Sequence, residues 1–160
     1  MTQPSNDTPQ IIAPPPILYL GALLICFLLN YLYPAELRNN RQILFVCGGM
    51  IFLLSATFAR WAFKTMHKER TSPNPYKVSE HLTTSGPFKY SRNPIYLAMT
   101  GLYLAIALVM NSIWPFVLLL PLFLIMHWGV VLREETYLTS RFGETYLVYK
   151  KDVPRWLLIH

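Results

Sequence analysis

Four long apolar segments dominate this chain of 160 residues. They cover residues 17–33, 43–63, 95–110 and 113–132. A helix needs roughly 20 apolar residues to cross the hydrocarbon core of a bilayer, with a tolerated range of about 17–25. The third segment is short, and the other three fit. Because lipid offers no partners to bare backbone groups, helices are the expected form. The sequence therefore predicts an all-α, polytopic membrane protein with about four transmembrane helices.

The composition supports this prediction. Hydrophobic residues make up 53% of the chain and charged residues only 14%, whereas charged residues make up about 25% of an ordinary soluble domain. A soluble fold of this size could not bury so much apolar surface, and disordered segments have the opposite composition. The numbers argue against a soluble domain and exclude a disordered chain.

Basic residues are divided unevenly between the two sides of the predicted bundle. Arg38 and Arg41 lie on one side, and eleven Lys and Arg residues lie on the other, in residues 64–94 and 133–160. The positive-inside rule then places both termini in the cytoplasm, for an integral protein of the cell inner membrane or its equivalent. This topology and anionic membrane lipids account for the net charge of +6, so nucleic acid is not expected as a partner.

The remaining organisation is simple. Residues 1–16 are rich in proline and are expected to form a flexible tail. Residues 17–160 are expected to form a single membrane-embedded domain. Cys26 and Cys47 are expected to be small buried hydrophobes, because the sequence has no Cys/His ligand spacing and no metal site is predicted. The Gly48-Gly49 pair is a candidate helix contact, and the oligomeric state stays open.

The third and fourth apolar segments predict a helical hairpin that turns at Asn111-Ser112. Its two arms, back to Arg92 and on to Glu134, are about 27 Å and about 33 Å long. Arg92 and the Glu134-Glu135 pair are therefore expected at similar depth on one face. A guanidinium and two carboxylates that converge there could form a polar site, or they could be ordinary flanking charges.

The sequences that flank this hairpin carry a resemblance. Residues 85–96 read Ser-Gly-Pro-Phe-Lys-Tyr-Ser-Arg-Asn-Pro-Ile-Tyr, and residues 134–149 contain Glu-Glu and then Phe-Gly-x-x-Tyr-x-x-Tyr. In this order, with an apolar hairpin between them, the fragments resemble the isoprenylcysteine carboxyl methyltransferase family and its phospholipid methyltransferase relatives. The match covers roughly residues 80–156. Two positions depart from the family pattern: Asn93 replaces a histidine, and Ala98 replaces a glycine.

The resemblance implies an integral membrane methyltransferase with S-adenosylmethionine as cofactor. It implies a lipophilic small molecule or a lipidated acceptor, such as an isoprenylcysteine-like carboxylate or a lipid, as the partner. Carried over residue by residue, Arg92, Pro94 and Tyr96 match the first family motif, and Glu134 and Glu135 match the second. The charges of the cofactor then suggest that Arg92 holds its carboxylate and that Glu134 or Glu135 binds its ammonium or ribose hydroxyls. Arg155 would orient an anionic acceptor oxygen. The candidate catalytic residues are Arg155 and Glu135, and the candidate cofactor-binding residues are Tyr90, Arg92, Asn93, Pro94, Tyr96, His127, Glu134 and Glu135.

Some alternatives stay open. His127 lies seven residues before Glu134, which is nearly the same helix face, so it could line the cofactor site or make a helix contact. The C-terminal aromatic stripe predicts a cytoplasmic amphipathic helix that favours packing over cofactor contact; it contains Tyr137, Leu138, Phe142, Tyr146 and Tyr149. The alternative functions are an NADPH-dependent membrane reductase of the sterol-reductase type and a non-catalytic membrane scaffold.

Overall fold

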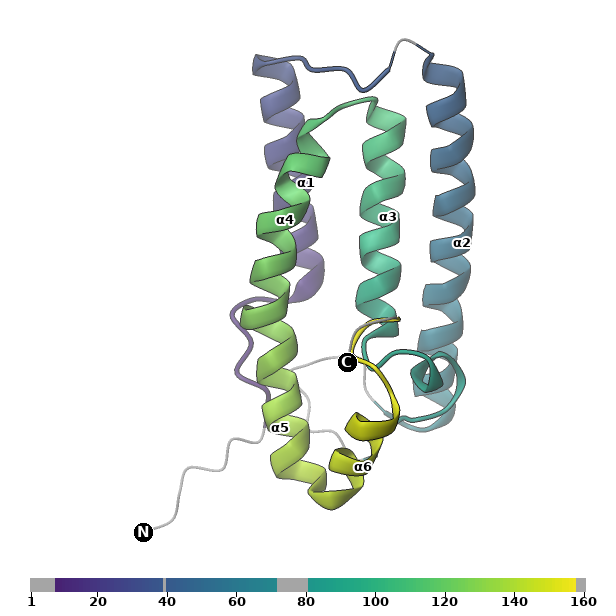
Figure 1. The fold of residues 1–160 in the computed structure, drawn as a ribbon, viewed down its shortest axis with the longest axis vertical. Coiled ribbons are helices and arrows are strands. Elements are labelled where there is room, and N and C mark those ends of the chain that lie inside the picture. Colours follow the sequence, from purple (N-terminus) through teal and green to yellow (C-terminus); the bar gives the residue numbers. More distant parts are fainter. Residues whose placement is uncertain (1–7, 39, 72–80, 158–160) are drawn as a thin grey trace.

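The computed structural model describes residues 8–38, 40–71 and 81–157, and it is all-α, as predicted, with no strand among those residues (Figure 1). Four antiparallel helices form the bundle, and shorter elements follow at one end. The long helices are α1 (Pro15–Leu32), α2 (Arg41–Lys68), α3 (Pro94–Met110) and α4 (Trp114–Met126). The other elements are the 3₁₀ turn η1 (Gly86–Lys89), the π turn η2 (His127–Val131), α5 (Leu132–Phe142) and α6 (Glu144–Asp152).

The described helices fit a polytopic membrane protein. Three of them are long and apolar enough to cross a bilayer: α1, α2 and the continuous helix Trp114–Phe142, with mean hydropathies of 1.8, 2.0 and 2.2. The fourth, α3, is a shorter apolar helix of 17 residues. It packs against α2 on one side and against α1 and α4 on the other. The shorter apolar helix α3 therefore lies between α2 and the pair formed by α1 and α4.

Asn111 makes the predicted hairpin turn between α3 and α4. It caps α3 in the left-handed conformation, with φ at 50°, a conformation that Asn tolerates better than most residues. Its amide also bonds the backbone of Arg38, accepting from the N–H at 3.1 Å and donating to the carbonyl at 2.9 Å. One side chain thus joins the hairpin turn to the loop between α1 and α2.

Small residues set the close packing of α2 on α3. A Cβ built at Gly48 would lie 2.9 Å from the Ala105 carbonyl oxygen, whereas a Cβ at Gly49 would meet no atom within 4 Å. Ala98 is 2% exposed, and it keeps the small size expected at that position. Glycine and alanine let helix backbones approach closely within a bilayer. The first glycine of the pair therefore serves a contact inside the chain.

Gly48→Val is expected to destabilise the bundle by about 1–3 kcal/mol, because the added side chain forces the α2 backbone away from α3. The matched control is Gly49→Val, which adds the same atoms to an open helix face. Thermal unfolding of both variants in the same detergent measures the difference. Equal unfolding temperatures for the two variants would contradict the close packing of α2 on α3 at Gly48.

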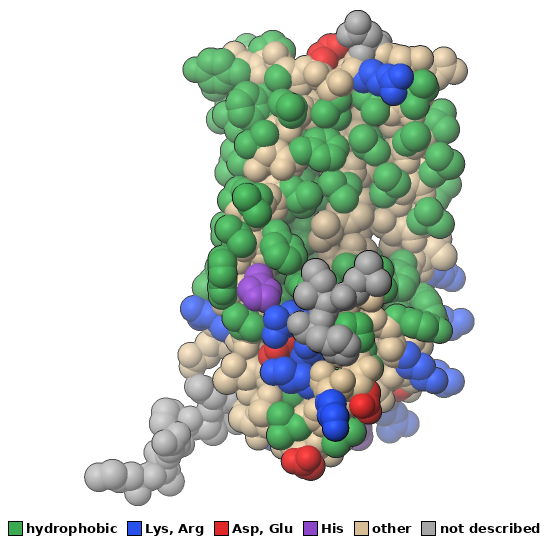
Figure 2. All heavy atoms as spheres, in the orientation of Figure 1, with side chains coloured by type: hydrophobic (Ala, Val, Ile, Leu, Met, Phe, Trp, Pro, Cys, Tyr) green, Lys and Arg blue, Asp and Glu red, His purple; other side chains and the backbone are tan. Residues whose placement is uncertain are grey.

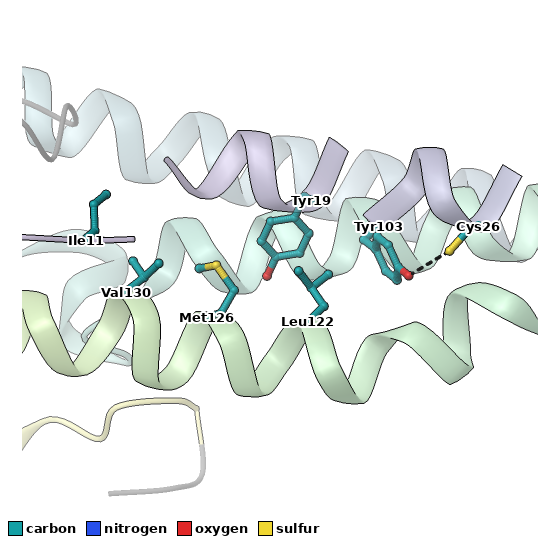
Figure 3. Packing of buried hydrophobic residues seen from close by; sticks show 7 residues of the cluster. All are labelled: Ile11, Tyr19, Cys26, Tyr103, Leu122, Met126 and Val130. Carbon is teal, nitrogen blue, oxygen red and sulfur yellow. Dashed lines mark hydrogen bonds between the residues drawn. The ribbon is translucent and has the colours of Figure 1, made fainter. Parts of the chain in front are cut away.

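A buried cluster fills the space between α1, α3 and α4 (Figure 3). Tyr103 is 1% exposed and donates its hydroxyl to the Pro115 carbonyl at 2.9 Å. Its hydroxyl also lies 3.3 Å from the Cys26 Sγ, and Cys26 is buried as expected, whereas Cys47 is only half-buried. The cluster consists of Ile11, Tyr19, Cys26, Tyr103, Leu122, Met126 and Val130.

The proline-rich N-terminal segment differs from the flexible tail that the sequence suggests. Residues 1–7 lie outside the described residues. The described remainder packs on the bundle, because Ile11 is 8% exposed within the core cluster and α1 already begins at Pro15. Proline is unfavourable in the interior of a helix, but it does not prevent an extended segment from burying a side chain.

The two ends of the bundle differ in charge. Green apolar side chains cover most of its length, and basic side chains gather at the end that carries α5 and α6 (Figure 2). At the opposite end Arg41 pairs with Glu36. The fold thus places the predicted polar residues at one end of an apolar bundle.

Candidate functional site

Glu135, on the first turn of α5, lies at the centre of a cluster of cations. Arg155 grips its carboxylate with two hydrogen bonds, from Nε at 2.7 Å and from Nη2 at 2.9 Å. Arg92 approaches Oε1 with Nη1 at 2.9 Å, and the Lys150 Nζ lies 3.4 Å from Oε2. Glu135 is only 5% exposed. A buried carboxylate of this kind is stabilised by its cationic partners, and its burial without them would destabilise the folded protein.

These contacts join three distant parts of the chain. Arg92 precedes α3, Glu135 belongs to α5, and Arg155 follows α6. Backbone bonds reinforce the junction, because the Arg92 N–H donates to the Pro154 carbonyl at 2.9 Å. The Asn93 side-chain amide donates to the Arg155 carbonyl at 3.1 Å. At the position that departs from the family pattern, the asparagine thus serves as a hydrogen-bond donor.

Glu134 differs from its neighbour in its surroundings. It is half-buried, and its Oε1 accepts a hydrogen bond of 2.6 Å from the Tyr96 hydroxyl. The Tyr96 carbonyl in turn accepts from Thr100, whose hydroxyl lies 2.7 Å from that of Tyr19. Among the described residues, no cation lies within ion-pair distance of Glu134. Its carboxylate is therefore positioned without being neutralised by a cation.

A cavity of about 160 Å³ lies between these elements. Arg92, Glu134 and Glu135 supply its charged wall, and Thr83 and Tyr96 add hydroxyls. The other walls are mostly apolar, and they include Met66, Phe88, Ile95, Val131 and Leu138. A concave apolar site with a few convergent polar groups is typical of small-molecule binding.

Arg92 carries an unused donor beside this cavity. Its side chain is 4% exposed, and its Nε is buried with no hydrogen-bond partner among the residues that the structure describes. Buried guanidinium donors are rarely left unpaired in folded proteins. Three cations also surround the single Glu135 carboxylate, so the cluster has an excess of positive charge. Both features fit an anionic group of a ligand.

Two tyrosines of α6, Tyr146 and Tyr149, line the cavity on the side of the C-terminal helices. Tyr146 is 1% exposed, and burial together with the nearby Glu135 charge raises its pKa to about 12. Tyr149 donates its hydroxyl to the Phe88 carbonyl at 2.8 Å, and burial raises its pKa above the usual value. Both phenols are therefore neutral near pH 7, and Tyr149 fastens α6 to η1.

The structure brings together most of the residues singled out from the sequence. Arg92, Asn93, Pro94, Tyr96, Glu134 and Glu135 all line the cavity. Arg155 lies behind Glu135 and is not among the lining residues. The predicted C-terminal helix is divided in two, because Gly143 at φ 53° separates α5 from α6. Of the stripe, Tyr137, Leu138, Tyr146 and Tyr149 line the cavity, and Phe142 packs beside it.

Two of the predicted cofactor-binding residues lie elsewhere. Tyr90 is 58% exposed, and its ring lies 6.4 Å from that of Trp61. His127 stacks on Phe123 at 6.0 Å and does not line the cavity. Conversely, the cavity includes Pro9, His81 and Thr83, to which the sequence assigns no role. No periodic pattern connects these residues to the hairpin, so no sequence signal identifies them.

Comparison with known proteins gives one family and one relative. A family model described as phospholipid methyltransferase matches residues 43–145, well over half of the chain. An uncharacterized protein of Haemophilus influenzae is 35% identical over 63 residues, which cover 39% of this chain and all of that protein. No solved structure matches the chain significantly.

Proposed function

The chain belongs to the phospholipid methyltransferase family, and from this membership we propose that it is an S-adenosylmethionine-dependent methyltransferase that acts on a lipophilic acceptor within a membrane. The membrane is the cell inner membrane or its equivalent, with both termini in the cytoplasm, as the distribution of basic residues indicates. The single observation that carries the proposal is the Arg92–Glu135–Arg155 junction, which builds a charged cavity at the end of an apolar bundle.

The residues present fit this cofactor. S-adenosylmethionine has a carboxylate, an ammonium and a sulfonium in one small molecule. Within the described part of the chain, the cavity has a buried guanidinium whose Nε has no hydrogen-bond partner, and it has the Glu134 carboxylate with no cation beside it. Arg92 suits the carboxylate of the cofactor, because its planar fork matches carboxylate geometry. Glu134 suits the ammonium or the ribose hydroxyls.

The other residues act by positioning Arg92 and Glu134. Glu135 holds Arg92 in place, and Arg155 holds Glu135, so both are positioning residues in this proposal. Tyr96 orients Glu134 through the bond of 2.6 Å. When bound, the cofactor supplies an electrophilic methyl group on its sulfonium. Methyl transfer is an in-line substitution, so the contribution of the chain is to fix geometry and exclude water.

The acceptor is proposed to be lipophilic because of where the cavity lies. Ile95 lies at the start of the apolar helix α3, and Val131 lies at the end of η2, which continues α4. Both residues line the cavity. The charged wall is formed by Arg92, Glu134 and Glu135, and basic side chains gather at the same end of the molecule, which carries α5 and α6 (Figure 2). A polar cofactor delivered from water and an apolar acceptor delivered from lipid would therefore reach the same cavity from different sides.

Binding calorimetry on the detergent-solubilised chain tests the proposal. We expect saturable binding of S-adenosylmethionine and of its demethylated product, S-adenosylhomocysteine, with no binding of NADPH. Binding of NADPH alone would indicate the reductase alternative, and binding of neither ligand would indicate a scaffold. Labelled methyl transfer into a total lipid extract, followed by identification of the labelled species, then identifies the acceptor.

A further inference from the structure

The outer face of α2 carries a shallow apolar groove. Five residues of this one helix line it: Leu53, Leu54, Thr57, Phe58 and Trp61. Leu53 and Leu54 are 68% and 71% exposed, so no described part of the chain packs over them. Because α2 is long and apolar enough to cross a bilayer, the groove is open to the acyl chains of membrane lipids.

The groove faces away from the candidate functional site. Gly48, which contacts α3, and Met66, which lines the cavity, each lie nine residues from Thr57 of the groove. Nine residues make two and a half helical turns, so both lie on the face of α2 opposite to Thr57. The helix itself therefore separates the groove from the cavity.

A stripe of three cations continues the groove toward the basic end of the bundle. Arg60, Lys64 and Lys68 follow one another at intervals of four residues, and all three are exposed. Residues at this spacing are neighbours on one helix face. Arg60 and Lys64 come three and seven residues after Thr57, so the stripe begins where the groove ends.

This cationic stripe has no acidic partner within the described ranges. None of its three residues takes part in an ion pair, and Glu69, the acid that follows Lys68, instead accepts a hydrogen bond from the Ser85 hydroxyl. Arg60 lies about 12 Å along the axis from the end of α2, which places it inside the apolar helix. A charged side chain at such a position is costly without a partner, so the stripe favours an anionic ligand.

Two exposed aromatic rings mark the depth of this stripe in the membrane. Trp61 directly follows Arg60, and its ring lies 6.4 Å from the ring of Tyr90. Tryptophan and tyrosine are enriched at the boundary between the hydrocarbon core and the lipid head groups. The head groups are therefore expected at the level of Arg60 and Lys64, and Tyr90, which does not line the cavity, belongs to this boundary.

We propose that the outer face of α2 binds one anionic phospholipid, with an acyl chain in the groove and the phosphate between Arg60 and Lys64. Both side chains pair with phosphate oxygens, and the aliphatic stem of Arg60 lets its guanidinium reach the head-group level. Basic clusters beside a membrane helix recognise anionic lipids. This lipid is a bound component and not the methyl acceptor, because α2 separates it from the cavity. The proposal does not rest on the proposed function.

Native mass spectrometry of the full chain in detergent, with added phosphatidylglycerol or phosphatidylcholine, tests the head-group contacts. The wild type is expected to bind phosphatidylglycerol more tightly than phosphatidylcholine. Arg60→Gln combined with Lys64→Gln should weaken phosphatidylglycerol binding about 25-fold, because each basic residue near the membrane surface contributes about fivefold. The matched control combines Arg38→Gln with Lys151→Gln, which removes the same charges from exposed positions elsewhere. Equal affinities of the two double variants would overturn the proposal, and so would equal binding of the two lipids by the wild type.

A variant that fills the groove tests the acyl-chain contact without changing any charge. Thr57→Phe places a ring in the groove, and Val46→Phe places the same ring on the same face of α2, three turns earlier and outside the groove. Both positions are exposed, so both variants should unfold at the temperature of the wild type. We expect a loss of phosphatidylglycerol affinity with Thr57→Phe and none with Val46→Phe. Unchanged affinity in Thr57→Phe would remove the groove from the site and contradict the proposal.

Calorimetry with S-adenosylhomocysteine on the same preparations separates this lipid site from the proposed function. Arg60→Gln with Lys64→Gln should leave the affinity for S-adenosylhomocysteine unchanged while phosphatidylglycerol binding falls. A parallel loss of both ligands would contradict a separate lipid site. A wild type that binds phosphatidylglycerol through Arg60 and Lys64 but binds no S-adenosylhomocysteine would remove the proposed cofactor and keep the lipid site.

Discussion

Glu135→Ala is expected to destabilise the protein by about 3–5 kcal/mol, more than any other substitution in the candidate site. The substitution leaves Arg92, which is 4% exposed, without its carboxylate, and it also frees Arg155 and Lys150. An uncompensated buried cation costs far more than the loss of a surface ion pair. Because the junction joins α5 to the chain before α3 and after α6, the C-terminal region should detach from the bundle.

Thermal unfolding in detergent measures this effect, with near-ultraviolet circular dichroism as the signal. The matched control is Glu144→Ala, which removes an exposed glutamate from the next helix and is expected to change stability by less than about 0.5 kcal/mol. Glu135→Gln should fall between the two, because it keeps acceptor capacity without the charge. An unfolding temperature for Glu135→Ala equal to that of Glu144→Ala would show that the junction is not structural.

Glu134→Ala is expected to have the opposite profile, with a large loss of cofactor affinity and little loss of stability. Glu134 has no cation partner among the described residues, so its removal strands no buried charge. Charged hydrogen bonds contribute about 1.5–3 kcal/mol, which corresponds to a loss of about 10–150-fold in affinity for S-adenosylmethionine. Calorimetry and thermal unfolding on the same preparation give both quantities.

Tyr96→Phe is the control for this prediction, because it keeps the carboxylate and removes only the hydroxyl that orients it. Its loss of affinity should be smaller, about 3–10-fold. If Glu134→Ala bound S-adenosylmethionine as tightly as the wild type, the ligand ammonium and ribose would have to be held elsewhere. The contrast between two adjacent acids makes the test specific, since simple removal of negative charge would affect both alike.

The sequence predicts the bundle well because its signals are strong and local. Apolar length specifies the helices, prolines mark the starts of α1 and α3, and Asn111 marks the hairpin turn. The near-equal arms of the hairpin correctly bring Arg92 and the two acids to one level. Adjacent residues in a helix point about 100° apart, so Glu134 and Glu135 must have different surroundings. The sequence does not indicate which of the two faces the basic residues. Which of them meets Arg155 depends on the path of α6.

The position of His127 differs from the one that regular helical periodicity predicts, because the helix is locally irregular. In a regular α-helix, a residue seven positions before Glu134 would lie on nearly the same face. The π turn η2 occupies residues 127–131, between the two. One additional residue in a turn rotates what precedes it by about 100°, and His127 accordingly faces Phe123 and Trp128. No sequence signal identifies this turn, although Gly129 lies within it.

The short length of α3 has a consequence for where two reactants can meet. The 17 residues of α3 span about 26 Å, whereas the 28 residues of α2 span about 42 Å. The lower end of α3 lies short of the lower end of α2 (Figure 1), and Arg92 and Asn93, just before α3, line the cavity there. In the proposed reaction, a water-soluble donor would enter this cavity while the tail of a lipid acceptor remained in the leaflet. Neither molecule would then have to leave its own solvent completely before the two came together.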